Sequence, residues 1–465
     1  MAAIALGSWA GRRTLAASIV GSGAVFLEGT VVNVALPAIA RDLGLGLDGV
    51  QWVVNAYLLA LGALTLLGGA LGDRYGRRRL FRIGAIAFAI ATTGCALAPS
   101  ALLLLVLRFV QGAAGAMLVP NSLAMLEASF DAEERGTAIG RWAGWSAVST
   151  AIGPLLGGSL VDATSWRWVF AVIAPVAITA AALALGDDPT EEREKGSKHV
   201  DYVGAALIVV GLGALTAGLI DGPKRGFSSP LILSLVIAGV VLLVAFAIFE
   251  HRIDSPLLPP ELFRSTAFSG ANAATVLIYA GLSGLILLLV LQLQGNLKYS
   301  ALESGAALLP TNALMLLLSP LAGRVAHRYG ARLPMAVGAV VAGFGMVLFS
   351  RVVPGASYVK TILPAVIVFG LGLSSLVAPL TAAVLAAAPD EQAGTASGVN
   401  NAAARLAGLL SAAALPAAAG LGGLEQLAGE RFTQGFARAM WICAGLCWVA
   451  AVVTWLTVRQ ERDRS

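Results

Sequence analysis

Long apolar segments alternate with short polar connections along the whole chain. A helix that crosses a bilayer needs about 20 predominantly apolar residues, and fourteen segments of the sequence reach that length. The pattern therefore predicts an all-α membrane protein. The predicted spans are 14–40, 50–71, 80–98, 101–126, 136–163, 165–186, 202–221, 230–250, 267–294, 300–323, 333–352, 358–386, 393–419 and 434–458.

Two polar turns repeat each other at a spacing of 254 residues. Residues 69–78 read GALGDRYGRR and residues 323–332 read GRVAHRYGAR, and each turn lies between two apolar segments. A second pair of similar stretches, ERGTAIG at 134–140 and EQAGTASG at 391–398, is offset by 258 residues at the shared Gly-Thr-Ala. Two parallel six-helix bundles with two extra helices between them account for both spacings, and such repeats are common in transporters.

The repeat predicts three regions along the chain. Residues 1–186 are expected to form an N-terminal six-helix bundle, and residues 267–465 a C-terminal one. Residues 187–266 between them are expected to hold a linker and two extra transmembrane helices, and the polar stretch 187–201 is the linker. A substrate cavity is expected near the membrane midplane between two such bundles.

The distribution of basic residues predicts the orientation in the membrane. Of 31 Lys and Arg residues, 20 lie in or beside the connections and tails that a cytoplasmic N-terminus places inside, and 9 lie outside. Arg108 and Arg405, the remaining two, fall within helices. The bias predicts cytoplasmic N and C termini, and it explains the positive net charge without a nucleic-acid partner. The excess of Arg over Lys, 26 to 5, is typical of a GC-rich bacterial genome.

The composition also argues against other classes of protein. The chain is 58% hydrophobic and 12% charged, which is too apolar for a soluble protein of this length. Cys95, Cys443 and Cys447 lie in apolar segments without metal-ligand spacing, and we interpret them as small hydrophobic residues. We expect neither a metal nor a cofactor. Because the sequence holds no Gly-x-x-x-x-Gly-Lys-(Ser/Thr) phosphate loop, an ion gradient is expected to drive any transport.

Four motifs occur in order along the N-terminal half. Residues 27–37 read LEGTVVNVALP, the turn at 69–78 carries Asp and Arg, and residues 108–112 read RFVQG. The fifth predicted helix holds Gly140 and the sequence GPLLGG at 153–158. Together they resemble the major facilitator superfamily, in its 14-helix drug:proton antiporter branch of the multidrug efflux type, and the resemblance covers nearly the whole chain. Glu28 stands where this branch usually has Asp, and Ser149 stands where the motif expects Gly.

Glu28 and Arg108 are the residues that we expect to couple transport to protons. A carboxylate inside hydrocarbon is costly and usually faces a cavity. Burial disfavours its charged form and a nearby cation favours it, so a group poised between these effects can bind and release a proton. Arg108 is expected to tune this group, directly or through water. The competing interpretations are a structural acid bonded to Thr30 or a neighbouring helix, and an arginine that only holds the bundle together.

The resemblance also implies two gating elements. The turn after the second helix resembles a cytoplasmic latch that is made in one conformation and broken in the other, and the fifth helix resembles the hinge that seals antiporters against leak. Positive-inside anchoring and ordinary small-residue packing are the alternatives. His327 replaces the acid in the second copy of the turn. The residues concerned are Asp73, Arg74, Gly76, Arg77 and Arg78 in the turn, and Gly153, Pro154, Gly157 and Gly158 in the fifth helix.

Amide and aromatic side chains are candidates for the substrate path, because they can hold flat, amphipathic or cationic molecules. Asn33, Trp52, Asn55, Gln111 and Trp145 are the predicted substrate-binding residues. Asn400 and Arg405 are interpreted as structural polar residues, buried between helices. The same chemistry, with packing as the competing interpretation, is present at Tyr57, Asn121, Trp142, Tyr279, Gln292 and Asn312.

The resemblance implies a function as well as a fold. We expect proton-coupled efflux of hydrophobic or cationic drugs across the cytoplasmic membrane of a bacterium, by alternating access and as a monomer. The partners are then a small-molecule substrate, protons and the bilayer. A dedicated exporter of one metabolite or self-made antibiotic is the alternative within transport. A membrane enzyme or a non-transporting sensor is the alternative of another class.

Overall fold

The structure is a computed structural model that describes residues 4–185, 200–253, 256–389, 392–423 and 427–458. Within these ranges the regular elements are all helical. Their order is α1 (Trp9–Leu43), α2 (Leu47–Tyr75), α3 (Arg77–Leu97), α4 (Ala101–Ser129), α5 (Ala132–Ala163), α6 (Arg167–Ala171), α7 (Ile173–Leu183), α8 (Tyr202–Arg225), α9 (Pro230–Glu250), η1 (Pro260–Arg264), α10 (Thr266–Gly295), α11 (Ala301–Ala306), α12 (Leu309–Tyr329), α13 (Arg332–Phe349), η2 (Tyr358–Ile362), α14 (Leu363–Ala386), α15 (Ala393–Ala418) and α16 (Glu430–Thr457).

These elements correspond to the fourteen predicted spans. Eleven helical segments of the described chain are long and apolar enough to cross a membrane. The other three are α5 and α15, two long helices rich in small and polar residues, and the shorter apolar segment Arg167–Leu183, which comprises α6 and α7. The predicted all-α membrane fold with fourteen helical segments is confirmed.

Several helix boundaries differ from the predicted ones. The predicted span 165–186 is divided into α6 and α7, which meet at Val172. The predicted span 300–323 begins with the separate helix α11, and α12 then starts beside Pro310 and continues to Tyr329. Proline lacks an N–H group and is tolerated in the first turn of a helix. Several helices also extend beyond their apolar segments, because polar residues at the membrane surface can continue the backbone hydrogen bonds of a helix.

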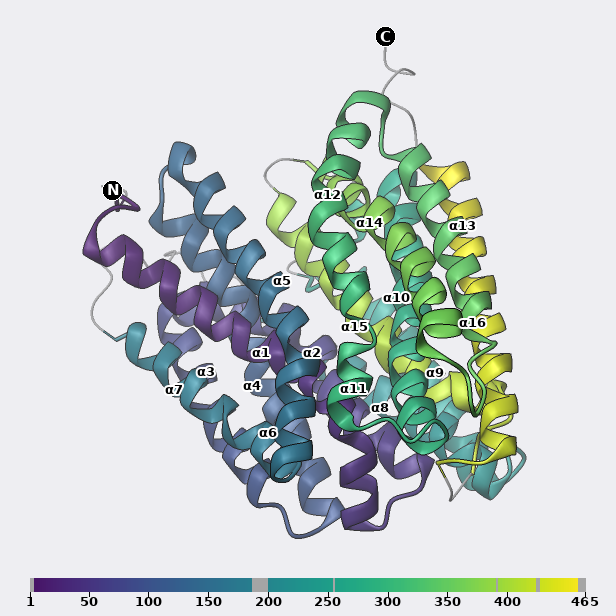
Figure 1. The fold of residues 1–465 in the computed structure, drawn as a ribbon. Helices are drawn as coiled ribbons and strands as arrows, with labels where there is room; N and C mark the ends of the chain where they lie inside the picture. Colours follow the sequence, from purple (N-terminus) through teal and green to yellow (C-terminus); the bar gives the residue numbers. More distant parts are fainter. Residues whose placement is uncertain (1–3, 186–199, 254–255, 390–391, 424–426, 459–465) are drawn as a thin grey trace. The chain divides into compact units, whose positions relative to one another are not determined.

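The chain forms two compact units (Figure 1). Unit 1 comprises Met1–Leu45, Trp52–Gly213 and Ala238–Leu258. Unit 2 comprises Gly46–Gln51, Ala214–Ile237 and Pro259–Ser465. Helices α2, α8 and α9 therefore contribute residues to both units.

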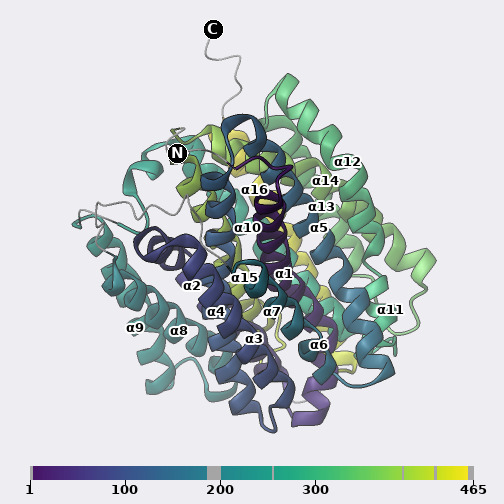
Figure 2. The same cartoon turned by 90° about the vertical axis from the view of Figure 1, so that its left-hand side faces the viewer.

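Helix α1 is the centre of unit 1. It packs against α4, α5 and α7, and Figure 2 shows α1 among these helices. Two glycines allow the approach of α5: Gly153 lies against Thr30, and a Cβ atom at Gly157 would lie 2.7 Å from the carbonyl oxygen of Val31. Small residues are how membrane helices come close to one another.

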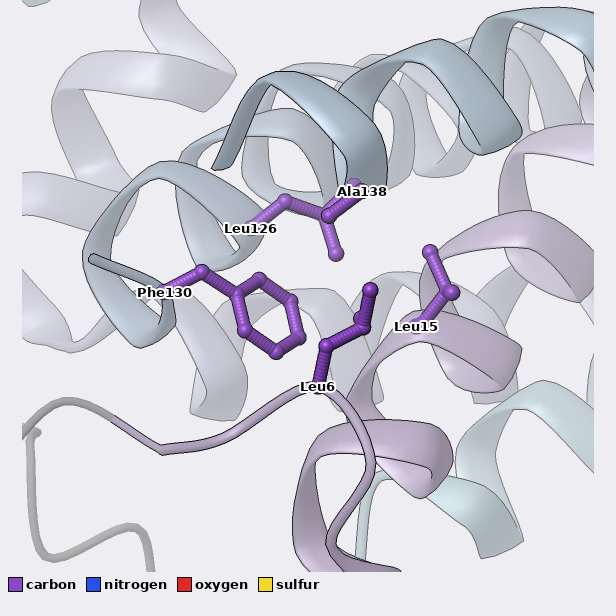
Figure 3. Packing of buried hydrophobic residues seen from close by; sticks show 5 residues of the cluster. All are labelled: Leu6, Leu15, Leu126, Phe130 and Ala138. Atoms are coloured by element: carbon purple, nitrogen blue, oxygen red, sulfur yellow. The ribbon is translucent and has the colours of Figure 1, made fainter. Parts of the chain in front are cut away.

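A hydrophobic cluster fixes the chain that precedes α1. Leu6 packs with Leu15 of α1, Leu126 and Phe130 at the end of α4, and Ala138 of α5 (Figure 3). The backbone N–H of Leu6 donates to Oε2 of Glu134, at 2.6 Å, and the N–H of Ile4 donates to the Ser129 carbonyl, at 2.9 Å. Residues 4–6 therefore join three helices at one end of unit 1.

Unit 2 is built around α10, which packs against α15 and α16, and around α13, which packs against α14 and α16. Gly345 of α13 lies against the backbone of Phe369 on α14. The rings of Phe349 and Phe369 then meet edge to face, with centroids 6.1 Å apart. Short loops and capping residues hold the helix ends, as in the capping box that Ser300 and Glu303 form at α11.

Candidate functional site

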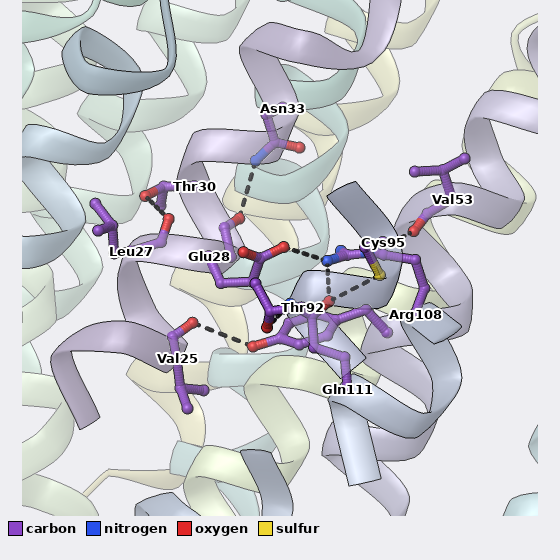
Figure 4. Close-up of polar contacts among 12 residues, drawn as sticks. Val25, Leu27, Glu28, Thr30, Asn33, Val53, Thr92, Cys95, Arg108 and Gln111 are labelled. Atoms are coloured by element: carbon purple, nitrogen blue, oxygen red, sulfur yellow. Dashed lines mark hydrogen bonds and ion pairs between the residues drawn. The ribbon is translucent and has the colours of Figure 1, made fainter. Parts of the chain in front are cut away.

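An ion pair is enclosed in unit 1 between α1 and α4. Glu28 is fully buried and Arg108 is 2% exposed. Nη1 of Arg108 donates to Oε1 of Glu28 and to Oε1 of Gln111, the latter at 2.7 Å. Figure 4 shows the two charged groups facing each other inside the bundle. Removing Arg108 would leave the buried Glu28 carboxylate without a cation, which is strongly destabilising, by several kcal/mol.

The guanidinium of Arg108 has further partners that hold its position. Its Nε donates to the Val53 carbonyl of α2, at 3.1 Å. The ring of Tyr57 lies 4.4 Å from the guanidinium carbon, a cation–π geometry. The Tyr57 hydroxyl donates to the Val25 carbonyl of α1, at 3.1 Å. Arg108 therefore stays oriented by α2 and Tyr57 whether or not the carboxyl of Glu28 is charged.

The Glu28 carboxyl is held less completely than the arginine. Its Oε2 makes no hydrogen bond to the described residues. Thr30, the alternative partner that the sequence offered, donates instead to backbone carbonyls of its own helix. One carboxyl oxygen is thus paired with a cation and the other accepts no hydrogen bond, which suits a group that must take up and release a proton.

A polar relay extends from the pair toward α3. Nε2 of Gln111 donates to the hydroxyl of Thr92, at 2.8 Å, and the Cys95 thiol lies 4.0 Å from Oε1 of Gln111. Thr92 and Cys95 were not predicted as site residues, because a Thr or Cys in an apolar segment carries no signal of its own. Gln111, predicted to bind substrate, is here the residue that joins Arg108 to this relay.

The other predicted substrate residues lie in different surroundings. Nδ2 of Asn33 donates to the Gly29 carbonyl of its own helix, and the side chain is only partly buried. Trp52 is partly buried, whereas Trp145 is 56% exposed. Asn55 is fully buried, and neither its amide nitrogen nor its oxygen has a hydrogen-bond partner among the described residues. Buried polar groups are nearly always paired, so Asn55 is the most conspicuous polar group of this set.

The wider set of amide and aromatic candidates is mostly engaged in helix packing. Nδ2 of Asn121 donates to the carbonyls of Gly68 and Met117. Nε1 of Trp142 donates to the Ser22 hydroxyl, at 3.0 Å. Nε2 of Gln292 donates to the Val352 carbonyl and to Thr433. These contacts fit the packing interpretation.

The polar turn between α2 and α3 is an ordered arrangement of charges. Asp73 near the end of α2 and Arg77 at the start of α3 form an ion pair, at 2.8 Å, and Nη1 of Arg77 donates to the Ala124 carbonyl of α4, at 3.2 Å. Gly76 has a φ of +99°, which side-chain-bearing residues rarely adopt.

The other arginines of the turn have different partners. Arg78 is buried and donates to the Ala184 carbonyl beyond α7. Arg74 lies over the ring of Tyr75.

Glu127 is a charged residue near this turn that the sequence did not single out. It lies on α4 and interacts electrostatically with Arg77, Arg135 and Asp73. The predicted span ends at 126, one residue before Glu127. In the structure α4 continues to Ser129, which places the carboxyl beside the turn.

The fifth-helix glycines divide into two groups. Gly153, Gly157 and Gly158 are buried, and Pro154 lies inside the unbroken helix α5. Gly140, by contrast, has open space where a Cβ would be. Ser149, which replaces a motif glycine, packs with its hydroxyl against Gly23 of α1. Close approach to α1 therefore depends on the Gly-Pro-x-x-Gly-Gly part of the motif.

In unit 2, Asn400 donates through Nδ2 to Oδ1 of Asn272, at 3.1 Å, and to the hydroxyl of Thr275, at 2.7 Å. This links α15 to α10. Arg405 is only partly buried and interacts with Tyr279. Asn400 is thus a polar link between two helices, as predicted, but both side chains are only partly buried, so the predicted full burial is wrong.

Comparison with known proteins identifies the family. The model of the Major Facilitator Superfamily matches residues 18–412 and again 273–465. The chain belongs to the major facilitator superfamily. It is 34% identical over 452 residues to the puromycin resistance protein pur8 of Streptomyces alboniger, covering 94% of this chain and 90% of that protein. The chain is therefore a multi-pass transporter of the bacterial cell membrane.

Further relatives carry names that refer to multidrug resistance or export. The multidrug resistance protein Stp of Mycobacterium tuberculosis is 34% identical, with 84% of this chain and 72% of that protein covered. The multidrug export protein EmrB of Haemophilus influenzae is 31% identical, with 82% and 75% covered. Among solved structures, the POT family transporter PepTSo shares the fold with a TM-score of 0.68 at 15% identity, covering 96% of this chain and 97% of that one.

Proposed function

We propose that this transporter exports hydrophobic or cationic antibiotics in exchange for protons, with Glu28 as the proton-binding group. The enclosed Glu28–Arg108 pair is the observation that carries the proposal. The names of relatives that are more than 30% identical over most of the chain support the class of substrate. In this proposal the protein works as a monomer, needs no cofactor, is not an enzyme, and has both termini in the cytoplasm.

The chemistry of the pair suggests how a proton is coupled to transport. While Glu28 is ionised, it is held by Arg108, and α1 is fastened to α4. Protonation removes the Coulomb attraction but not the other contacts of Arg108 with Val53, Gln111 and Tyr57. The arginine then keeps these three contacts, while α1 loses the ion pair that joined it to α4. A proton therefore loosens α1 from α4 without leaving an isolated guanidinium.

Substrate contact is assigned to Gln111, which lies beside this pair, and to Asn55 of α2. Gln111 shares the arginine with Glu28. The buried amide of Asn55, which makes no hydrogen bond among the described residues, supplies both a donor and an acceptor. Apolar walls with a few placed polar groups are typical of sites for small molecules. A cationic substrate that approaches the Glu28 carboxyl would compete with the proton, which links the two movements.

The α2–α3 turn and α5 are proposed as the gate. Asp73 and Arg77 are half-exposed, so their ion pair can break and re-form at little cost. The contact between Arg77 and the Ala124 carbonyl ties this pair to the end of α4. The buried glycines of α5 place that helix directly on α1, the helix that carries Glu28. A movement of α1 would therefore displace α5, because the two helices are in direct contact.

Transport into vesicles tests the proposal. Purified protein is reconstituted with a pH-sensitive dye in an acidic lumen, and puromycin or tetraphenylphosphonium is added outside. Uptake of the compound with alkalinisation of the lumen is expected, and Glu28→Gln should abolish both without loss of folded protein. Unchanged transport by that variant, or transport that follows a sodium gradient at constant pH, would refute proton coupling through Glu28.

A dedicated exporter of one antibiotic is the second candidate. Several relatives are named for a single compound, among them the tetracenomycin C resistance and export protein of Streptomyces glaucescens. The same vesicles distinguish the two functions. Proton movement with several unrelated compounds supports broad export, whereas movement with one chemical class alone supports a dedicated exporter.

A further inference from the structure

Two carboxyl groups face each other at one end of the α8–α9 hairpin, within unit 1. Asp201 directly precedes α8, and Glu250 is the last residue of α9. Their exposed fractions are 8% and 3%. The hairpin is closely packed, since Gly211 of α8 lies against Leu242 and Leu243 of α9.

Each carboxyl group uses one oxygen on a backbone N–H. Oδ1 of Asp201 accepts from the N–H of Gly204, at 2.7 Å, and Oε2 of Glu250 accepts from the N–H of Leu258, at 2.7 Å. The two remaining oxygens, Oδ2 of Asp201 and Oε1 of Glu250, are buried and have no donor among the described residues. Both lie where a Cβ at position 204 would be, and the two groups interact directly.

The described surroundings supply no positive charge that would neutralise two carboxylates. The groups that act on Glu250 are Asp201 and the backbone N–H groups of Leu257 and Leu258. His251 is exposed and faces the Ala247 carbonyl, at 2.9 Å, and Arg252 is exposed as well.

On the α8 side, the nearest titratable groups face away from the pair. The hydroxyl of Tyr202 lies 3.5 Å from that of Tyr75, on the exposed surface. Arg74 acts on Tyr202 and is not among the groups that act on Glu250. Two like charges in one buried place cannot both ionise, and such pairs hold one proton between them.

We propose that Asp201 and Glu250 bind one shared proton and form a second proton-binding site, separate from Glu28. The proton lies between Oδ2 of Asp201 and Oε1 of Glu250, so that one oxygen donates and the other accepts. All four carboxyl oxygens then have a partner. The hydrogen bond made by this proton links the start of α8 to the end of α9, and we call this link the clasp. Loss of the proton leaves two carboxylates that repel each other at the open end of the hairpin.

Thermal unfolding of the full-length protein in detergent tests the clasp. Because the proton is bound by the folded arrangement, stability should fall as the pH rises enough to remove it. In a Glu28→Gln parent we expect the unfolding midpoint to drop by at least about 3 °C between about pH 6 and about pH 9. In Glu250→Gln the amide donates to Asp201 permanently, and this part of the pH dependence should disappear.

Asp221→Asn is the matched control. Asp221 lies near the other end of α8, where it pairs loosely with Arg225, at 4.0 Å, and the variant should follow the pH profile of its Glu28→Gln parent. All variants are made in a Glu28→Gln background, which removes the other acid that is buried among the described residues. The readout is independent of transport, so failure of the clasp and failure of the proposed export are distinguishable.

Infrared spectroscopy of the same samples gives a second readout that does not depend on the variant folding. A protonated-carboxyl C=O band should be present in the Glu28→Gln protein and disappear on titration to high pH. Absence of that band, or a pH profile of Glu250→Gln equal to that of its parent, would overturn the proposal. Stabilisation of the parent protein by added Na⁺, Mg²⁺ or Ca²⁺ at high pH would overturn it too, since the pair would then be a cation site.

Discussion

Glu28 on α1 and Arg108 on α4 are 80 positions apart in the sequence and form an ion pair that is closed off from solvent. The arginine is held by five neighbours, among them Val53, Gln111 and the ring of Tyr57. The glutamate is paired with the arginine through Oε1, and its Oε2 accepts no hydrogen bond from the described residues. This inequality makes the carboxyl the member of the pair whose state can change.

The first prediction concerns the energetics of that pair. Arg108→Ala leaves Glu28 without its cation and should destabilise the protein by about 3 kcal/mol or more. Combining it with Glu28→Gln should recover much of the loss, because no buried charge is then left unpaired. Unfolding midpoints of the two single variants and the double variant measure this coupling. Additive losses would contradict the pairing.

Arg108→Lys separates charge from shape at the same position. Lysine keeps the positive charge but not the planar fork with several donors. It cannot serve Glu28, Gln111 and the Val53 carbonyl together, so we expect a folded protein with export reduced at least about tenfold, a loss of about 1.4 kcal/mol. The measurement is the initial rate of proton-coupled uptake in vesicles. A rate equal to wild type would show that charge alone suffices and that Gln111 plays no part.

Much of this arrangement was predictable from the sequence. The rest was not predictable, and the reasons are physical. A lone acid and a lone arginine in apolar helices are conspicuous because each is costly in lipid. Their partnership depends on the rotation and depth of α1 against α4, which the composition of neither helix determines. Thr92 was missed because threonine is common in membrane helices. Glu127 was missed because α4 extends beyond its apolar segment. Gly140 and Gly157 look alike in sequence, yet only Gly157 touches another helix.

That difference between glycines gives the next prediction. Gly157→Ala puts a methyl group 2.7 Å from the Val31 carbonyl oxygen, in the backbone of α1, and should destabilise unit 1 by about 1–3 kcal/mol. Gly144→Ala is the control, since its Cβ would meet open space and alanine favours a helix over glycine by about 1 kcal/mol. Thermal unfolding of both variants is the measurement. Equal midpoints would mean that α5 does not depend on this contact.

The polar turn between α2 and α3 makes a different kind of prediction. Asp73→Asn removes an exposed ion pair, so stability should change by no more than about 1 kcal/mol. Export should nevertheless fall severalfold if the pair is part of a gate. Arg79→Gln, which removes an exposed charge from the same turn, serves as the control and should transport normally. Equal transport by the two variants would assign the turn to anchoring in the membrane surface.

The last prediction concerns a helix irregularity in unit 2. Pro416 lies inside α15 and has no N–H to donate to the carbonyl of Ala412, four residues earlier. Nε2 of Gln51 donates to that carbonyl, at 2.6 Å, and to the Ala413 carbonyl, at 3.1 Å. Gln51 is 3% exposed, so its loss would leave a buried acceptor unpaired. Gln51→Leu should therefore cost about 1–3 kcal/mol, measured by thermal unfolding.

Pro416→Ala provides the complementary variant for this contact. Alanine restores the backbone N–H, which can then bond the Ala412 carbonyl within α15. The Gln51→Leu change should cost less in that background than in the wild type, because only the Ala413 contact is lost. An equal cost in both backgrounds would show that Gln51 does not compensate for the proline, and that its amide is held there for another reason.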